Sequence, residues 1–248
     1  MKVLIVSDLH YALKQYDWVT QMSEKFDLVI IAGDLLDLSS IVDREVQSVI
    51  ALKYLSKIQA GARLVVSSGN HDCLEELKDG EQAALWLQKG RGEMTAVDGD
   101  SVMIDDMLVT VCPWWDGEHG RELVRKQIEA DAAKEKKNWI WIYHAPPQDS
   151  PVSWTGKTHF GDTYLNEWIK EFKPQMVFCG HVHQSPFRNG GSWIHEEEGA
   201  FTFNAGKQLG PIPSFLVWDT DGNQVTWVSQ AGTERVTLSS PIEKEVLA

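Results

Sequence analysis

The sequence has few cysteines and no long hydrophobic run, and each absence excludes a class of protein. Its 248 residues include three cysteines, which are scattered and form no CxxC pair, so we expect neither a disulfide framework nor a zinc–thiolate site. No stretch reaches the ~20 apolar residues of a membrane span. The apolar start of the chain meets Asp8 and His10 too soon for a signal peptide. We therefore expect a cytoplasmic protein with no membrane partner.

Positive charge is also scarce, because 23 lysine and arginine residues stand against 36 aspartate and glutamate residues, a formal net charge of −13. Proteins that bind along nucleic acid need a basic face, so we expect no stable nucleic-acid partner. A phosphate ligand remains compatible with this charge, because carboxylates gathered around divalent cations would account for part of the acidic excess. The sequence contains no signal for the oligomeric state.

Short runs rich in valine and isoleucine alternate with segments of helical period in the first third of the chain. This pattern is typical of parallel strands joined by crossover helices. We expect strands at 3–6, 27–32, 62–67, 138–143, 175–179, 200–204, 215–219 and 224–229, a mixed sheet at 94–112, and helices at 43–59, 117–137 and 162–172. No repeat or linker is present, so we expect a single domain over 1–248 with a polar C-terminal tail, loose or docked, at about 239–248.

A polar cluster follows each of five predicted strands, and the carboxyl ends of such strands meet at one edge of a sheet. Together these clusters contain Asp, Asn and His side chains, a mixed set of oxygen and nitrogen donors that suits Mn²⁺, Fe²⁺ or Zn²⁺. The candidate metal ligands are Asp8, His10, Asp34, Asn70, His144, His181 and His183. This set exceeds the needs of one ion, so we expect two divalent ions, whose identity stays open, about 3.5–4 Å apart.

Each of these residues also has a structural explanation when it is taken alone. Asp34 or Asn70 is the kind of residue that caps a turn at the end of a strand. His144 alone is more often a hydrogen-bonded histidine at the end of a strand. Only the five clusters together, each directly after a strand, favour a metal centre.

The order DxH, GDxxD, GNHD, H and GHxH resembles the calcineurin-like metallophosphoesterase superfamily over residues 8–183. The resemblance implies an α/β fold in which two mixed β-sheets pack as a sandwich with helices on both outer faces, the four-layer arrangement of metallo-dependent phosphatases. It implies that the first ion is bound by Asp8, His10 and His183, and the second by Asn70, His144 and His181. Asp34 then resembles the carboxylate that bridges the two ions.

The resemblance also implies roles for three further residues. His71 resembles the family's proton donor and phosphate-contacting group. Asp72 is then expected to hold the His71 imidazole in one tautomer and to raise its pKa, because a general acid must be protonated near neutral pH. Asp37 is expected to orient a metal ligand. The implied reaction is hydrolysis of a phosphoester by a hydroxide that bridges the two ions, without a covalent phosphoenzyme.

The substrate is expected to be a small phosphoester, and the chain favours a phosphodiester. Phosphoprotein phosphatases of the superfamily resemble GDxVDRG and RGNHE, whereas this chain has Asp37-Leu38-Ser39 and Ser68-Gly69-Asn70 at those places. Both arginines that clamp a dianionic monoester are missing. A phosphomonoesterase, a nuclease of the same superfamily, and a non-catalytic scaffold or binding module on this fold are the alternatives.

Two segments outside the five clusters have open roles. Trp114 and Trp115 follow a predicted strand directly, and the segment 145–161 is long and rich in proline and glycine. Such loops often cover functional sites, and the indole rings would stack on an apolar group of a substrate. The alternative is that both tryptophans pack in the core, as most of the eleven in this chain are expected to do.

Overall fold

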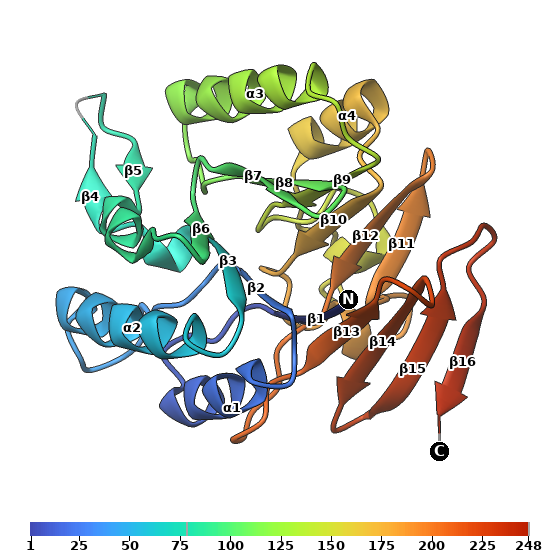
Figure 1. Ribbon diagram of the computed structural model, residues 1–248, viewed down its shortest axis with the longest axis horizontal. Helices are drawn as coiled ribbons and strands as arrows, with labels where there is room; N and C mark the ends of the chain where they lie inside the picture. Colours follow the sequence, from blue (N-terminus) through green and yellow to red (C-terminus); the bar gives the residue numbers. More distant parts are fainter. Residues whose placement is uncertain (78, 248) are drawn as a thin grey trace.

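Branched apolar residues place β-strands at the centre of the molecule, as the sequence pattern predicts. The computed structural model describes residues 1–77 and 79–247 and has two large mixed sheets with helices outside them (Figure 1). The eight-stranded sheet has the order β16 (Lys244–Leu247), β15 (Gly232–Thr237), β14 (Gln224–Ser229), β13 (Phe215–Asp219), β1 (Lys2–Val6), β2 (Leu28–Ala32), β3 (Arg63–Ser67) and β6 (Thr95–Val97). The six-stranded sheet has the order β11 (Ile194–Glu197), β12 (Ala200–Asn204), β10 (Met176–Cys179), β9 (Asn138–Ile142), β8 (Met107–Val111) and β7 (Ser101–Ile104).

The helices form the two outer layers (Figure 1). The longest are α1 (Leu13–Ser23), α2 (Arg44–Ile58), α3 (Glu118–Ala132) and α4 (Thr163–Phe172). The helices α1 and α2 pack on the eight-stranded sheet, and α3 and α4 pack on the six-stranded sheet. Shorter elements are the pair β4 (Glu75–Glu76) and β5 (Gln82–Ala83) and the 3₁₀ turns η1 (Asn70–Asp72), η2 (Leu85–Gly90), η3 (Pro151–Ser153) and η4 (Ser185–Phe187). The predicted four-layer α/β sandwich is therefore confirmed.

Strand β1 shows why these runs are apolar at every position. Val3 and Ile5 point into the core between the two sheets, whereas Leu4 and Val6 point toward the helices α1 and α2. A strand that is buried on both faces has no polar face to alternate with the apolar one. The pattern of the sequence therefore reports a central strand in a layered fold.

Parallel pairing brings the ends of the central strands to one edge of each sheet. In the first sheet β1, β2, β3 and β6 are parallel neighbours. In the second sheet β8, β9, β10 and β12 are parallel neighbours. The polar clusters predicted from the sequence follow β1, β2, β3, β9 and β10, so both sheets contribute to one site.

Several elements differ from the expected pattern. The segment expected as a tail contains β16, which pairs with β15 at the edge of the first sheet. Main-chain hydrogen bonds to an open edge need no apolar side chains, so the polar sequence of β16 gives little sign of a strand. The helix expected at 117–137 ends at Ala132, and the helix α1 and the strands β4, β5, β11 and β15 were not among the expected elements. No helix in the described part of the chain is long and apolar enough to cross a membrane.

Candidate metal centre

The loops that follow the parallel strands are tied to one another by main-chain hydrogen bonds. The N–H of Asp8 donates to the carbonyl of Gly33 at 3.1 Å, and the N–H of His10 donates to the carbonyl of Asp34 at 2.9 Å. The loop after β10 is held in the same way, because Oδ1 of Asp8 accepts the N–H of His181 at 2.9 Å. Three loops from two sheets are therefore fixed around the Asp8 carboxylate.

Much of this edge is built from backbone in the left-handed region. The φ angles of Asp8, His10, Asp34 and His181 are 55°, 42°, 54° and 67°. Such conformations cost about 1–3 kcal/mol each and gather at active sites and ligand clamps, where surrounding contacts enforce them. Close approach also demands glycine, because a Cβ at Gly69 would lie 2.2 Å from Oδ1 of Asp34. The fold therefore gives up stability to bring these side chains together.

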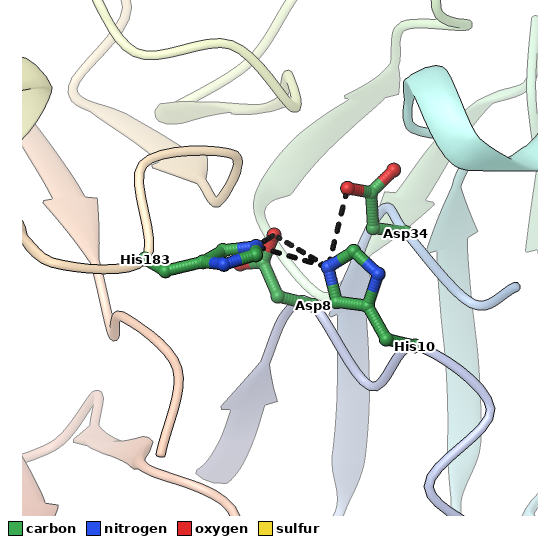
Figure 2. Close-up of side chains that lie close together, drawn as sticks. All are labelled: Asp8, His10, Asp34 and His183. Carbon is green, nitrogen blue, oxygen red and sulfur yellow. Dashed lines mark hydrogen bonds and ion pairs between the residues drawn. The ribbon is translucent and has the colours of Figure 1, made fainter. Parts of the chain in front are cut away.

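The first cluster contains Asp8, His10, Asp34 and His183, whose side chains point toward one another (Figure 2). Nε2 of His10 lies 2.9 Å from Nε2 of His183 and 3.5 Å from Oδ2 of Asp34. Nε2 of His183 lies 3.3 Å from Oδ1 of Asp8. Donor atoms are expected about 3.3 Å apart around a tetrahedral ion whose bonds are about 2.0–2.1 Å long. The structure thus brings the predicted ligands of the first ion to the spacing of a single metal site.

The second cluster contains Asp34, His144 and His181, with Asn70 beside it. Nε2 of His144 lies 3.3 Å from Oδ2 of Asp34, and Nδ1 of His181 lies 2.8 Å from Oδ1 of Asn70. The Nδ1–H of His144 donates to the carbonyl of Ala32 at 2.7 Å, which turns Nε2 toward the site. That buried Nε2 has no hydrogen-bond partner among the described residues. A buried ring nitrogen that faces only the predicted bridging carboxylate fits a metal ligand.

The carboxylate of Asp34 belongs to both clusters. Its Oδ2 faces His10 and His144, while its Oδ1 accepts the N–H of His71 at 2.9 Å, which fixes the plane of the carboxylate. Burial raises the pKa of Asp34, but attraction from His144 and other imidazoles more than offsets this and lowers the pKa to about 2. Burial and the nearby His144 lower the pKa of His181 to about 4. Burial lowers the pKa of His144, but attraction from Asp34 more than offsets this and raises the pKa to about 9, so His144 would release a proton when an ion binds. The oxygen and nitrogen donor set fits two divalent ions that share Asp34.

The predicted pairing of Asp72 with His71 is wrong. Oδ1 of the buried Asp72 accepts the N–H of Leu36 at 2.9 Å, and Oδ2 accepts the N–H of Gly69 at 2.8 Å. Both oxygens therefore bind backbone and hold two loops together. Burial lowers the pKa of His71 below its ordinary value, whereas the predicted pairing required a raised pKa. The reason is geometric, because η1 is a 3₁₀ turn in which successive side chains point about 120° apart.

His71 lies at the open side of the two clusters. Its Nε2 is 4.0 Å from Oδ2 of Asp34, and its side chain is 24% exposed. The N–H of Leu38 points at Nδ1 from 3.4 Å, which favours the proton on Nε2, the atom that faces the site. Asp37 lies nearby, with an oxygen within 4.8 Å of ring nitrogens of His10 and His71. Its Oδ1 accepts from Ser39, so its role in orienting a ligand stays a prediction.

Asn204 is a residue of the site that the sequence patterns did not single out. It is fully buried at the end of β12, and its amide nitrogen donates to the carbonyls of Gly180 and Val182 at 3.1 and 3.0 Å. Those carbonyls flank His181, so Asn204 positions the loop that carries His181 and His183. A signal was available, because Asn204 follows an apolar strand just as the five clusters do.

An aromatic pocket of about 290 Å³ opens beside the second cluster. Its main walls are Trp114, Trp115, Phe160, Tyr164, His144 and His181. Both tryptophans that follow β8 are half-buried and face this space, so they do not simply fill the core. From the segment 145–161, Ala145, Phe160 and Gly161 also reach the pocket. We call this space the aromatic pocket.

A buried acid behind the pocket fixes one of its walls. Oδ1 of Asp98 accepts the N–H of Ser68 at 2.8 Å, and Oγ of Ser68 accepts the N–H of Trp114 at 2.9 Å. Asp98 is 6% exposed, and burial raises its pKa to about 7. The chain Asp98–Ser68–Trp114 therefore links a titrating group to the backbone of the pocket wall.

The raised pKa of Asp98 predicts a stability that depends on pH. The folded protein holds this proton up to about pH 7, whereas the unfolded chain loses it near pH 4, so the free energy of unfolding falls as pH rises between these values. Relative to Asp98→Asn, which cannot titrate, the wild type should lose about 2–3 kcal/mol between pH 5 and pH 8. Urea unfolding of both proteins at the two pH values measures this difference. If the free energies of unfolding of wild type and Asp98→Asn differ by the same amount at pH 5 and pH 8, the raised pKa of Asp98 is contradicted.

Comparison with known proteins agrees with this geometry. The family model described as calcineurin-like phosphoesterase matches residues 1–185. No curated protein sequence matches the chain. The crystal structure of TT1561 of Thermus thermophilus is 14% identical with a TM-score of 0.57, and the match covers 99% of this chain and 98% of that one.

Two further solved structures are similar to this chain. Purple acid phosphatase PPD1 from yellow lupin (Lupinus luteus) seeds is 13% identical with a TM-score of 0.52, and the match covers 100% of this chain but 52% of that one. Wild-type Vps29 complexed with zinc from Entamoeba histolytica is 13% identical with a TM-score of 0.43, and the match covers 100% and 98% of the two chains. At these identities the two structures with the higher TM-scores are evidence for the fold alone.

Proposed function

Because this chain belongs to the calcineurin-like phosphoesterase family, we propose that it hydrolyses a small phosphodiester with two divalent ions held at the edge of its sheets. The observation that carries the proposal is the shared Asp34 carboxylate, whose Oδ2 lies 3.5 Å from Nε2 of His10 and 3.3 Å from Nε2 of His144. One carboxylate oxygen that faces two sets of imidazole donors is the arrangement of a bridging ligand. The ions would be Mn²⁺, Fe²⁺ or Zn²⁺, since the donors are imidazole, carboxylate and amide groups.

The protein's own residues position the ester and stabilise its leaving oxygen. Bound divalent ions would neutralise the phosphate charge and supply an activated water. Asp8 and Asp34 are almost fully buried, so the groups that hold the ions are rigid and shielded from solvent. His71 lies beside both clusters with its side chain partly exposed, and its Nε2–H would donate a hydrogen bond to the leaving oxygen of the ester and stabilise the charge that forms there.

The charge of the site favours a diester over a monoester. A phosphodiester carries one negative charge, whereas a phosphomonoester carries close to two at neutral pH. The sequence has no arginine at the two places where protein phosphatases have their clamp, because Leu38 and Ser68 stand there. Without a bidentate guanidinium fork the second charge of a monoester would be poorly matched. We expect no stable nucleic-acid partner, because the net charge is −13.

Loss of the His71 hydrogen-bond donor is expected to slow the reaction without removing the metals. His71→Ala should lower kcat for bis(p-nitrophenyl) phosphate by about 10²–10³, the usual effect of removing one donor that stabilises developing negative charge. Metal content should stay at that of the wild type. Nε2 of His71 lies 4.0 Å from the Asp34 carboxylate, and His71 belongs to neither the first nor the second cluster. The measurement is steady-state turnover of this diester and, in parallel, of the monoester p-nitrophenyl phosphate. The wild type should hydrolyse the diester faster than the monoester.

The alternative function is a non-catalytic binding module on the same fold. It predicts that the wild type binds two ions yet hydrolyses neither ester with Mn²⁺, Fe²⁺, Co²⁺ or Zn²⁺. A faster reaction with the monoester than with the diester would retain the phosphoesterase but reject the diester preference. Unchanged turnover in His71→Ala would reject the role of His71.

A further inference from the structure

The aromatic pocket adjoins the metal centre through two of the predicted ligands. His144 and His181 form its inner wall, so a molecule in the pocket would touch the same rings that face the second ion. The Trp114 ring lies 5.4 Å from that of His181 and 5.8 Å from that of His144, measured between centroids. The pocket is thus placed to receive whatever group extends from a phosphate held between the clusters.

The walls of the pocket are flat rings held in fixed positions. The indole N–H of Trp115 donates to the hydroxyl of Tyr143 at 2.7 Å, and the guanidinium of Arg121 lies 4.4 Å from the centre of the Tyr164 ring. The backbone of Trp114 is anchored on Ser68. Rings that are already ordered lose little entropy when a ligand binds between them. The pocket is therefore preorganised for a flat group.

Phe160 stands at the mouth of this pocket. Its ring stacks on that of His181, with centroids 4.9 Å apart and planes 25° apart, yet 58% of the residue is exposed. A large aromatic side chain that packs on a predicted metal ligand while most of it faces solvent gains little from burial in the free protein. A flat group that entered the pocket would cover it.

The residues that line the pocket offer no cation to a second phosphate. Among the described residues that line it, the acidic one is Asp162, and none is a lysine or an arginine. The Asp162 carboxylate accepts the hydroxyl of Tyr143 and caps α4 through the N–H of Tyr164. The Asp162 carboxylate is therefore occupied by hydrogen bonds within the protein, and its negative charge repels anions. A volume of about 290 Å³ is at the small end of ligand pockets, enough for one ring system and too small for a polymer.

We propose that the aromatic pocket binds a planar aromatic ring on the ester group of the substrate, which makes aryl or nucleoside phosphoesters the substrate class. This inference rests on the proposed function, since it takes the phosphate to lie between the two metal clusters. Phe160, Trp114 and Trp115 are then specificity-determining residues. The shared chemistry is a flat ring, benzenoid or nucleobase, joined to the phosphate through a short linker.

Binding of inert phosphonates to the metal-loaded protein tests this inference without requiring turnover. Calorimetry would compare benzylphosphonate with cyclohexylmethylphosphonate, which has similar bulk but is not flat, and with 5′-deoxyadenosine-5′-phosphonate, which has the same non-hydrolysable carbon–phosphorus bond and the same two acidic hydroxyls. Benzylphosphonate should bind about tenfold more tightly than the cyclohexyl compound, the size of a specific aromatic contact. Tighter binding of the adenosine compound than of the benzyl compound would identify the ring as a nucleobase, and the reverse order would identify it as benzenoid.

Variants of the exposed ring separate flatness from apolarity. Phe160→Ala should reduce the preference for the benzyl compound to less than threefold, and Phe160→Leu, which keeps an apolar side chain, should reduce it similarly. Trp18→Ala is the matched control, because Trp18 is a half-buried indole that packs against the Phe215 ring and does not line the pocket. That variant should retain the tenfold preference.

Equal binding of the flat and the non-flat phosphonates would overturn the inference, as would an unchanged preference in Phe160→Ala. The proposed function is judged separately by turnover of bis(p-nitrophenyl) phosphate. Turnover without a ring preference would leave the proposed function intact and reject the pocket's role. A ring preference without turnover would support the ring-binding pocket and reject the proposed function.

Discussion

Asp34→Asn is expected to lower kcat/KM for bis(p-nitrophenyl) phosphate by about 10⁴, because one oxygen serves both metal clusters and losing its charge removes several kcal/mol of stabilisation. The substitution keeps the shape of the side chain, and its remaining oxygen can still accept the N–H of His71 that Oδ1 accepts in the wild type. The fold should therefore survive while the shared ligand is lost. Metal analysis of the purified variant should find at most one ion per chain, against two in the wild type.

Asp131→Asn is the matched control for this prediction. Asp131 is as buried as Asp34, but it lies on α3, beside Thr110 and Lys134, outside the clusters of metal-ligating side chains. Its removal should change stability and leave metal content and kcat/KM within about twofold of the wild type. Full activity in Asp34→Asn, or an equal loss in both variants, would mean that the shared carboxylate is not the centre of the chemistry.

Removal of the metals is expected to lower stability by about 5 kcal/mol, since each ion at 100 times its dissociation constant contributes about 2.7 kcal/mol to the folded state. Asp8 and Asp34 are 0% and 1% exposed, and without a cation their like charges face each other in the interior. For a chain of this size the loss corresponds to a fall in melting temperature on the order of 10 °C. Calorimetric or fluorescence melting of metal-loaded and chelator-treated protein measures it.

Two variants serve as controls for the melting experiment. Asp131→Asn should show the same fall as the wild type when chelator is added. Asp34→Asn should show a smaller fall, because it is expected to have lost an ion already. A melting temperature that does not respond to chelator in the wild type would contradict the metal centre.

The positions of the candidate ligands could be predicted from the sequence because two local rules combine. A buried strand is readable from an unbroken apolar run such as 28–31, and the residues directly after parallel strands must meet at one edge. The structure brings all seven candidates to that edge, and Asp34 belongs to both the first and the second cluster. Asn204 follows from the same rule, because it ends β12, which the sequence predicts as a strand.

The direction of a side chain within a turn could not be predicted in the same way. His71 and Asp72 are adjacent in sequence, which suggested a pair, but η1 sends one toward the metal clusters and the other into the backbone of Leu36 and Gly69. Adjacency in sequence says little about contact until the backbone angles are known. The same limit applies to the aromatic pocket, whose walls come from segments near 115, 144, 160 and 181.

The missed helix has a different cause. The inward face of α1 contains Gln15 and Ser23 beside Tyr16 and Val19, so half of its buried positions are polar and the apolar period is weak. Gln15 is buried because its amide donates to the carbonyls of Gln208 and Gly210, a contact far away in sequence. Polar residues buried for such tertiary reasons remove the pattern on which helix prediction depends.

The most direct test is a titration of metal-free protein with Mn²⁺ while the turnover of bis(p-nitrophenyl) phosphate is measured. If Asp34 joins two metal sites that act together, turnover should rise steeply and reach its maximum at about two ions per chain. Turnover that is complete at one ion, or that persists in excess chelator, would contradict a dinuclear centre. Two bound ions without any turnover would contradict the phosphoesterase itself.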